Sequence, residues 1–363
     1  RAGPRSLRYI TVMPGPQRRK AAPRQMALGR AARVLAAALG VRGAGAWAAG
    51  GAGAGDTVSL LQTSPQLSRG GNVYYMHIPR TAGTSFSLDA AKLLFEDFNL
   101  FDPLTLINKE GCYGWRDTLG VSWVATMLRN PRNHVLSQYL LCGEGTIALM
   151  TSVQKGPGGF GLWVREWADI YRRKGDINGD FTNLEGMGKT REEQYLLFSG
   201  MPHKCYNPIN LQSHHFTCHH PFIYDNKTHG DVELVMQNMR KTRFVGIQEA
   251  YQESICLFAS KVLEEGLPHF CNCSDEEAWH SFQPGHFSYH SRKTRTFHNV
   301  SRHGEEVLRT IDEITALDRV LYKASVERFV GEVHLVEAQH GVRLLCGDKE
   351  ERLNELANLG PQA

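Results

Sequence analysis

Two short runs rich in apolar residues are each followed by a helical pattern. Residues 73–78 and 121–128 predict buried strands, because strands covered on both faces are mostly apolar instead of alternating. Ser301 to Val336 carries a longer helical pattern. The alternation of strands and helices predicts an α/β fold with a central parallel sheet flanked by helices. The apolar positions of the two shorter helical patterns are Leu88, Ala91, Leu94 and Phe95, and Val135, Leu136, Tyr139 and Leu140.

The loop after the first predicted strand has the composition of an anion-binding turn. A turn of small and hydroxylated residues between a strand and a helix aims backbone N–H groups and the positive helix end at an anion. An ordinary capped turn is the alternative. The Walker pattern is absent, which argues against a standard nucleoside triphosphatase. The residues of the loop are Arg80, Thr81, Ala82, Gly83, Thr84 and Ser85.

A second basic position follows the second predicted strand. Arg129 comes directly after this strand, and Ser137 lies about two turns into the next helix. Because the carboxyl ends of parallel strands meet at the edge where ligands bind, we expect Arg80, Arg129 and Ser137 to lie near one another. This arrangement fits a ligand with two separated phosphate-like groups.

Charge is distributed unevenly along the 363 residues. Residues 1–55 contain ten Lys and Arg residues and no acidic residue, which leaves 31 basic against 37 acidic residues in the remainder. The remainder is therefore net acidic and has no general electrostatic affinity for nucleic acid. We expect no nucleic-acid partner, and any anion must be bound by a local site.

Three features favour the secretory pathway. Residues 26–49 combine a basic flank, a short apolar stretch and small residues, as in a secretory signal or N-terminal anchor; a disordered leader or a transit peptide is the alternative. Eight cysteines, an even number, suit disulfides in an oxidising lumen. Sequons for N-glycosylation occur at Asn226, Asn272 and Asn299.

The chain is expected to contain one folded domain. We predict a disordered basic leader at 1–55, a catalytic domain at 56–347 and a polar C-terminal tail at 348–363. No run of 18 apolar residues occurs after the leader, so the only predicted membrane tether is N-terminal.

The two anion motifs resemble those of a known family. Residues 77–86 are similar to the 5′-phosphosulfate loop of Golgi carbohydrate sulfotransferases, in particular the heparan sulfate 2-O- and 6-O-sulfotransferase and uronyl 2-sulfotransferase branch. Residues 128–139 are similar to the 3′-phosphate motif of the same family. The resemblance spans about Asn72 to Val330, with weaker similarity at 193–200, 244–249 and 317–322.

The resemblance implies a P-loop-like three-layer sandwich that transfers a sulfuryl group from 3′-phosphoadenosine 5′-phosphosulfate (PAPS) to a carbohydrate hydroxyl, with no metal. Residues Thr81 to Ser85 would grip the phosphosulfate, and Arg129 and Ser137 would hold the 3′-phosphate. Arg80 would neutralise the charge that develops on the leaving oxygen. The implied partner is a glycan or polysaccharide acceptor, and the implied location is the Golgi lumen, with type II anchoring if the N-terminus is retained.

Two positions depart from the family pattern. The family usually has Lys where this chain has Arg80, so a planar guanidinium replaces a compact ammonium. The family also commonly has a His between the motifs that takes the proton of the acceptor hydroxyl, but residues 87–127 contain none. Asp117 is the first candidate to replace it, although a solvated surface carboxylate is the alternative interpretation. Further candidates are Glu110, Glu96 and Asp97.

Metal binding is a weaker hypothesis for a cluster of ligand-type residues. His215 and His219 would share one helix face, and Cys271 and Cys273 could join them, but no standard zinc spacing follows. Structural histidines with disulfide-bonded cysteines are the favoured interpretation.

Three classes of function fit the sequence. A PAPS-dependent carbohydrate sulfotransferase is the leading hypothesis, and a non-catalytic glycan-binding relative that has lost its base is the second. A nucleotide-dependent kinase is the third, and it would need a carboxylate-held Mg²⁺ and a preference for ATP.

Overall fold

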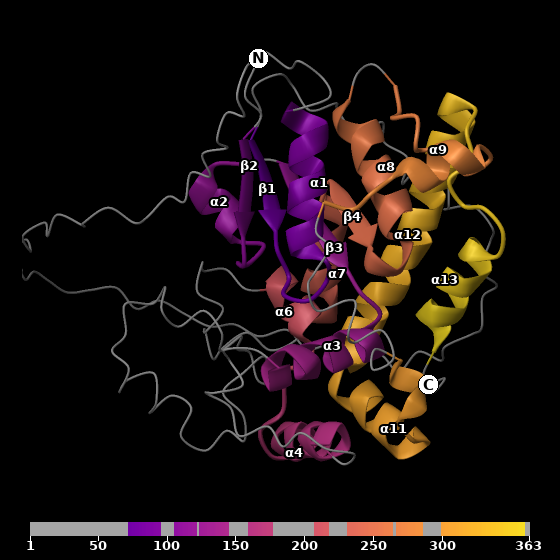
Figure 1. Cartoon of the computed structure of the whole chain (residues 1–363). Coiled ribbons are helices and arrows are strands. Elements are labelled where there is room, and N and C mark those ends of the chain that lie inside the picture. The colour runs from indigo at the N-terminus through magenta and orange to yellow at the C-terminus, as the bar shows by residue number, and fades with distance from the viewer. Residues whose placement is uncertain are drawn as a thin grey trace, which may run out of the picture. The chain divides into compact units, whose positions relative to one another are not determined.

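Strands β1 and β3 lie side by side in a parallel sheet in the computed structural model (Figure 1). Within the described residues the sheet has four strands, in the order β2-β1-β3-β4. These are β1 (Asn72–Met76), β2 (Thr105–Lys109), β3 (Trp123–Leu128) and β4 (Phe244–Ile247). The structure describes residues 72–95, 105–121, 123–144, 159–176, 207–217, 231–263, 266–285 and 299–359, all within one compact unit of the chain, 61–363.

Helices flank this sheet, and α1, α8 and α12 contact its strands. Helices α3 and α6 lie beneath the strands in Figure 1. The predicted α/β fold with a central parallel sheet and flanking helices is confirmed. The α-helices are α1 (Gly83–Phe95), α2 (Trp115–Leu119), α3 (Pro131–Glu144), α4 (Gly159–Lys174), α6 (Leu211–Thr217), α7 (Val232–Lys241), α8 (Tyr251–Val262), α9 (Glu276–Ser281), α11 (Glu305–Ile314), α12 (Ala316–His340) and α13 (Lys349–Asn358). Short 3₁₀ helices are η3 (Gln248–Ala250) and η4 (Val300–Arg302).

An aromatic core fixes α1 against the sheet. Phe86 stacks on Tyr75 of β1 with ring centroids 4.7 Å apart, and on Phe244 of β4 at 5.3 Å. Phe258 of α8 meets the same ring edge-on at 5.1 Å. All four side chains are fully buried, and burying one such side chain contributes about 1.5–3 kcal/mol. The position of Phe86 therefore sets the orientation of α1 at the end of β1.

The buried face of α1 differs from the face that the sequence predicted. Phe86, Ala90 and Leu93 are buried, whereas Leu88 and Ala91 are half-buried. The buried residues keep the spacing of one helix face, but the face is rotated because Phe86, the first large side chain of the helix, is drawn into the aromatic core. The sequence pattern located the helix correctly and misjudged its rotation.

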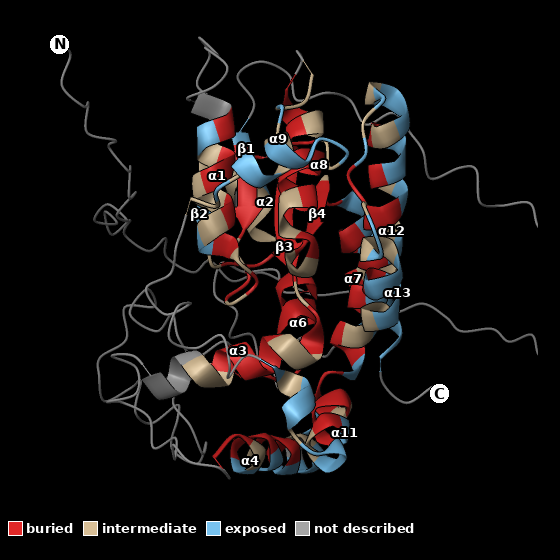
Figure 2. Cartoon of the chain, turned by 45° about the vertical axis from the view of Figure 1, so that its right-hand side comes forward, coloured by how far each residue is buried: buried red, intermediate tan, exposed pale blue. Residues whose placement is uncertain are grey.

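A second core lies away from the sheet, between α3, α4 and α11. Trp163 and Trp167 of α4 are buried in it, with Val135 and Leu136 of α3. Figure 2 shows α4 and α11 together, with buried residues on both. The long helical pattern of 301–336 divides into α11 and α12, because the backbone leaves helical geometry at Thr315, with φ −119° and ψ 24°.

Disulfide bonds tie the C-terminal part of the chain together. Cys256 is bonded to Cys271, and Cys273 to Cys346. Cys112 is also disulfide-bonded, and no described cysteine is free. Such bonds are typical of proteins that fold in an oxidising compartment.

Membrane attachment was predicted only for the N-terminal segment, which lies outside the described residues. None of the helices in the described ranges has the length and apolarity needed to cross a bilayer. The leader at 1–55 also lies outside them. The segment predicted as a polar tail contains α13, which is largely exposed but buries Leu353 (Figure 2).

Candidate functional site

The strand order reverses between the neighbouring strands β1 and β3. The chain goes from β1 to β2 on one side of β1, and then to β3 on its other side. In open α/β sheets ligands bind where the order reverses in this way. The pairing of β1 with β3 ends at Tyr75–Ala125, and beyond it the Thr126 hydroxyl donates to the Met76 carbonyl at 2.8 Å. The loops that start with His77 and Arg129 therefore begin at one place.

The loop after β1 has an unusual backbone. Arg80 (φ 68°) and Ala82 (φ 73°) are in the left-handed region, and Thr81 between them is not. A non-glycine residue in this conformation costs about 1–2 kcal/mol. In general, alternation of the two hands can point backbone N–H groups to one side and form an anion-binding concavity; in this loop the Thr81 N–H is bonded to the Ile78 carbonyl at 3.5 Å. The first N–H groups of α1, from Gly83 onward, remain as donors because they have no partner within the helix.

Neighbouring side chains hold the carbonyl groups of this loop. His134 of α3 donates from Nε2 to the Pro79 carbonyl at 2.7 Å, and Arg129 donates from Nη1 to the Arg80 carbonyl at 3.1 Å. The Thr81 hydroxyl donates to the Ile78 carbonyl at 2.9 Å. Each of these carbonyls is thereby fixed, and the strained loop is held in place by its surroundings.

The structure brings together the basic and hydroxyl residues that were predicted to meet at this edge. Arg80 Nε donates to the Ser137 Oγ at 3.1 Å, and Arg129 contacts the backbone of Arg80 as described above. Burial lowers the pKa of Arg129, and the charge of Arg80 lowers it further, while Glu249 raises it. Arg129 Nε is buried and has no hydrogen-bond partner among the described residues. A buried unsatisfied donor of this kind is costly unless an anion or water meets it.

The three predicted hydroxyl groups of the loop lie in different environments. Thr81 is fully buried and its hydroxyl is bonded within the loop. Thr84 is exposed and Ser85 is half-buried at the start of α1. Thr81 therefore shapes the loop, whereas Thr84 and Ser85 stand where a bound anion would meet the helix end.

Helix α6 supplies a contact that sequence analysis missed. Gln212 donates from Nε2 to the Arg129 carbonyl and accepts from the Arg129 N–H with Oε1, both at 2.9 Å. The side-chain amide thus pairs with the peptide unit of Arg129 as a neighbouring strand would. Gln212 lies 83 residues from Arg129 in sequence, and no local pattern marks it.

Three buried histidines near the loop after β1 are neutral. Burial lowers the pKa of His77 and of His215 to about 4, and that of His134 to about 3. The ring of His77 lies against Gly83, where an added Cβ would be 2.0 Å from His77 Cδ2. His215 Nδ1 bonds to the Gly111 carbonyl at 3.0 Å. These rings are buried next to the loop after β1 or to its neighbours and carry no charge near neutral pH.

Stability should fall as the pH decreases from 7 to 5. The folded-state pKa values of His77, His134 and His215 lie below the ordinary 6.5, so the unfolded chain binds more protons across this range. Each histidine contributes a slope of at most about 1.4 kcal/mol per pH unit. Asp318 acts oppositely below pH 6, because burial raises its pKa to about 6.

Urea unfolding at pH 7.5, 6.5 and 5.5 measures this dependence. His215→Gln removes one titrating ring and should make the slope shallower. His280→Gln is the matched control, because the His280 side chain is 72% exposed and its loss should leave the slope unchanged. A free energy of unfolding that stays constant from pH 7.5 to 5.5 would contradict the assignment of neutral buried rings.

The predicted base, Asp117, lies on α2. Its side chain is 76% exposed and pairs with Arg116 at 3.2 Å, and Arg116 also bonds to Tyr113 and stacks over its ring. No hydrogen bond or ion pair joins Asp117 to the Arg80 loop among the described residues. Glu110 is half-buried at the end of β2, and Glu96 and Asp97 lie outside the described residues.

The two cysteines of the metal hypothesis are bonded in disulfides. Cys271 and Cys273 belong to the two disulfides named above, so their sulfurs are not available as thiolate ligands. His215 is buried and bonded to a backbone carbonyl, and His219 lies outside the described residues. The described part of the chain has no group of three or more ligand-type side chains that could hold a metal.

The geometry thus defines one candidate site, formed by the loop after β1, the start of α3 and the helix α6 that supports them. No protein-family model, curated protein or solved structure matches this chain.

Proposed function

We propose that this protein is a carbohydrate O-sulfotransferase that uses PAPS as the sulfuryl donor. The observation that carries the proposal is the meeting of Arg80, Ser137 and Arg129 at the reversal point of the sheet, through contacts of 3.1 Å. The charge of Arg80 also acts on Arg129 and lowers its pKa, and an anion bound near both arginines would offset this like-charge effect. The unsatisfied Arg129 Nε supports an anionic ligand on independent grounds.

Different residues of the site would bind the two charged groups of PAPS. Residues Thr81 to Ser85 would bind the 5′-phosphosulfate, and Arg129 with Ser137 would bind the 3′-phosphate. When bound, PAPS supplies the sulfuryl group that is transferred. Arg80 would then stabilise the negative charge that develops on the leaving oxygen. Under this proposal the fold is a P-loop-like sandwich whose loop uses Arg in place of Lys.

Asp117 is the proposed base, but its exposure and its ion pair with Arg116 also fit a non-catalytic protein. An exposed carboxylate bound to Arg116 must leave that partner before it can accept a proton from a sugar hydroxyl. A relative that binds nucleotide and glycan without transfer is therefore the alternative proposal.

The disulfides and the basic leader fit a protein of the secretory pathway, and we propose the Golgi lumen, with or without an N-terminal anchor.

Ligand-dependent stabilisation tests the proposal. Titration with adenosine 3′,5′-bisphosphate should raise the melting temperature, because a ligand of the native state stabilises it by RT ln(1 + [L]/Kd). ATP should give a clearly smaller shift, since it has no 3′-phosphate for Arg129 and Ser137. A larger shift with ATP and Mg²⁺ would replace the sulfotransferase proposal with the kinase.

Transfer of radiolabelled sulfate from PAPS to a panel of polysaccharides separates the enzyme from the binding relative. Wild-type protein should label at least one polysaccharide, and Arg80→Ala should abolish labelling. Asp117→Asn should retain nucleotide binding and lower transfer at least tenfold if Asp117 is the base. Nucleotide binding without transfer to any acceptor would favour the non-catalytic relative.

A further inference from the structure

Glu249 connects the candidate site to the C-terminal helices. It lies in η3, directly after β4, at the same edge of the sheet as Arg129. Both oxygens of its carboxylate are engaged: Oε1 accepts from the Asn130 N–H at 3.0 Å, and Oε2 accepts from the Tyr322 hydroxyl at 3.1 Å. The bond to Asn130 spans 119 residues of sequence, so this side chain joins the turn after β3 to the segment that follows the neighbouring strand β4.

The charge of Glu249 suits its position. Asn130 immediately precedes α3, which begins at Pro131, and a carboxylate at a helix N-terminus is favourable because of the helix dipole. The negative charge also acts on Arg129 and raises its pKa against the effect of burial. Glu249 thus stabilises the charged form of the arginine that the site depends on.

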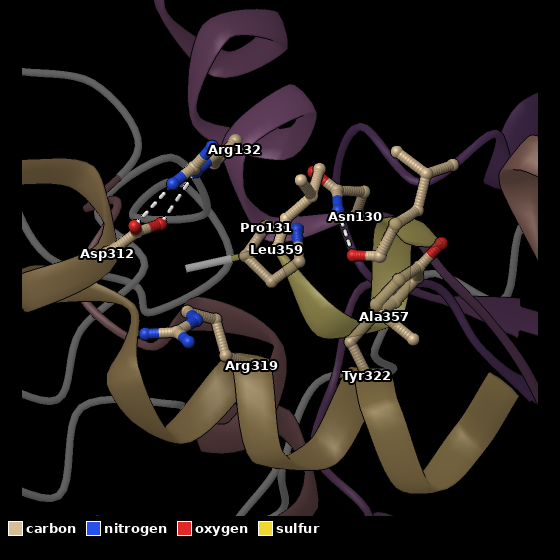
Figure 3. A pocket seen from close by; sticks show the side chains of 9 residues that line it. Asn130, Pro131, Arg132, Asp312, Arg319, Tyr322, Ala357 and Leu359 are labelled. Atoms are coloured by element: carbon tan, nitrogen blue, oxygen red, sulfur yellow. Dashed lines mark hydrogen bonds and ion pairs between the residues drawn. The ribbon is translucent and has the colours of Figure 1, made fainter. Parts of the chain in front are cut away.

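Asn130 is held from a third direction by α13. Its Nδ2 donates to the Leu356 carbonyl at 3.1 Å, shown as a dashed line in Figure 3. Lys349, the first residue of α13, donates from Nζ to the Glu249 carbonyl at 3.3 Å. The bond between Cys273 and Cys346 lies just before this helix. The turn of Arg129 and Asn130 is therefore held by η3 and α13, and α12 supports η3 through the bond of Tyr322 to Glu249.

Figure 3 also shows why Arg132 does not provide this support. It makes a bidentate ion pair with Asp312 of α11, at 2.8 and 2.6 Å, and so holds α3 to α11. The orientation of the Arg129 turn depends instead on the two peptide contacts described above, Gln212 on Arg129 and Glu249 on Asn130.

We propose that Glu249 is a positioning residue, which holds the Arg129–Asn130 turn by its two hydrogen bonds so that the Arg129 guanidinium faces the anion loop. The choice of adenosine 3′,5′-bisphosphate as the probe rests on the proposed function. The expected change in the orientation of Arg129 when Glu249 is replaced does not. A Gln side chain can still accept from the Asn130 N–H and meet the Tyr322 hydroxyl, so the amide should substitute for the carboxylate.

Three variants of the full chain test the proposal by calorimetric titration. Glu249→Ala should raise the Kd for adenosine 3′,5′-bisphosphate about tenfold or more, and Glu249→Gln should stay within about threefold of wild type. Glu253→Ala is the matched control, because the Glu253 carboxylate is buried and pairs with Lys349 at 3.2 Å but does not contact the turn. It should lower the melting temperature and leave the Kd unchanged.

A second measurement does not need a nucleotide. Phenylglyoxal modifies accessible arginines, and mass spectrometry of the peptide that contains Arg129 gives its rate of modification. Glu249→Ala should accelerate this rate, and Glu249→Gln and Glu253→Ala should not.

The outcomes separate the two proposals. If wild type does not bind the bisphosphate but Glu249→Ala exposes Arg129, the positioning role stands and the proposed function fails. An unchanged rate and an unchanged Kd in Glu249→Ala would overturn the positioning role. So would equal losses in Glu249→Ala and Glu249→Gln, because the charge alone would then be responsible.

Discussion

Replacing Arg129 by alanine is expected to weaken binding of adenosine 3′,5′-bisphosphate about 100-fold. A charge-assisted hydrogen bond contributes about 1.5–3 kcal/mol, and a factor of 100 corresponds to about 2.7 kcal/mol. The substitution also removes the donor to the Arg80 carbonyl, so the anion loop loses one of its supports. Titration calorimetry measures the change directly, and we expect the loss mainly as weaker affinity.

Two further substitutions show whether the lower affinity comes from the planar guanidinium of Arg129 or from a general loss of positive charge. Arg129→Lys keeps the positive charge but not the planar fork, and should recover only part of the affinity. Arg172→Ala is the control for a general loss of charge, because Arg172 makes a bidentate pair with Glu313 on the exposed surface of α4. Equal affinity in Arg129→Ala and wild type would exclude Arg129 from the ligand site.

Replacing Gly83 by alanine is expected to destabilise the protein and to damage the anion loop together. The added Cβ would lie 2.0 Å from His77 Cδ2 and 2.2 Å from its Nε2, distances that force the ring or the loop to move. Overpacking of this kind costs about 1–3 kcal/mol. We expect a lower urea midpoint and at least a tenfold weaker affinity for the bisphosphate.

The same substitution at Gly331 should have the opposite sign. Gly331 lies within α12, and nothing is found within 4 Å of an added Cβ. Alanine in an open helical position stabilises by about 0.4–1 kcal/mol.

A double variant tests the clash at position 83. When Gly83→Ala is combined with His77→Ala, the protein should be more stable than the sum of the two single effects predicts, because the clash is absent. Strict additivity of the two changes would show that the ring of His77 does not limit position 83.

The sequence predicted the elements whose signals are local. β1 and β3 are central strands, and their nearly continuous apolar residues distinguish them from the surface. Arg80 and Arg129 could be placed at one edge because parallel strands end together, and this required no knowledge of side-chain contacts. The contact between Arg129 and the Arg80 carbonyl confirms that both residues lie at one edge of the sheet. It does not identify the ligand.

The supporting residues could not be predicted, because their roles depend on contacts between distant segments. Gln212 pairs with the Arg129 peptide, and no local pattern marks it. Glu249 ends the weakly similar segment 244–249, but that segment does not indicate that its carboxylate accepts from the Asn130 N–H. His134 falls inside the second motif, yet nothing in the motif indicates that its ring reaches the Pro79 carbonyl. The rotation of α1 was misjudged for a similar reason, since stacking of Phe86 on two strands outweighs the average pattern of its helix.

The pairing of Gln212 with the Arg129 peptide limits how far the chain can be shortened. A fragment that ended before residue 207 would contain the whole β1–α1 unit, β3 and α3, and so both arginine motifs. It would still lack the side chain that holds the second arginine's peptide plane, together with all of β4. Efforts to express a minimal version of this protein should therefore extend through the final helix, even though both recognisable motifs lie in the first 140 residues.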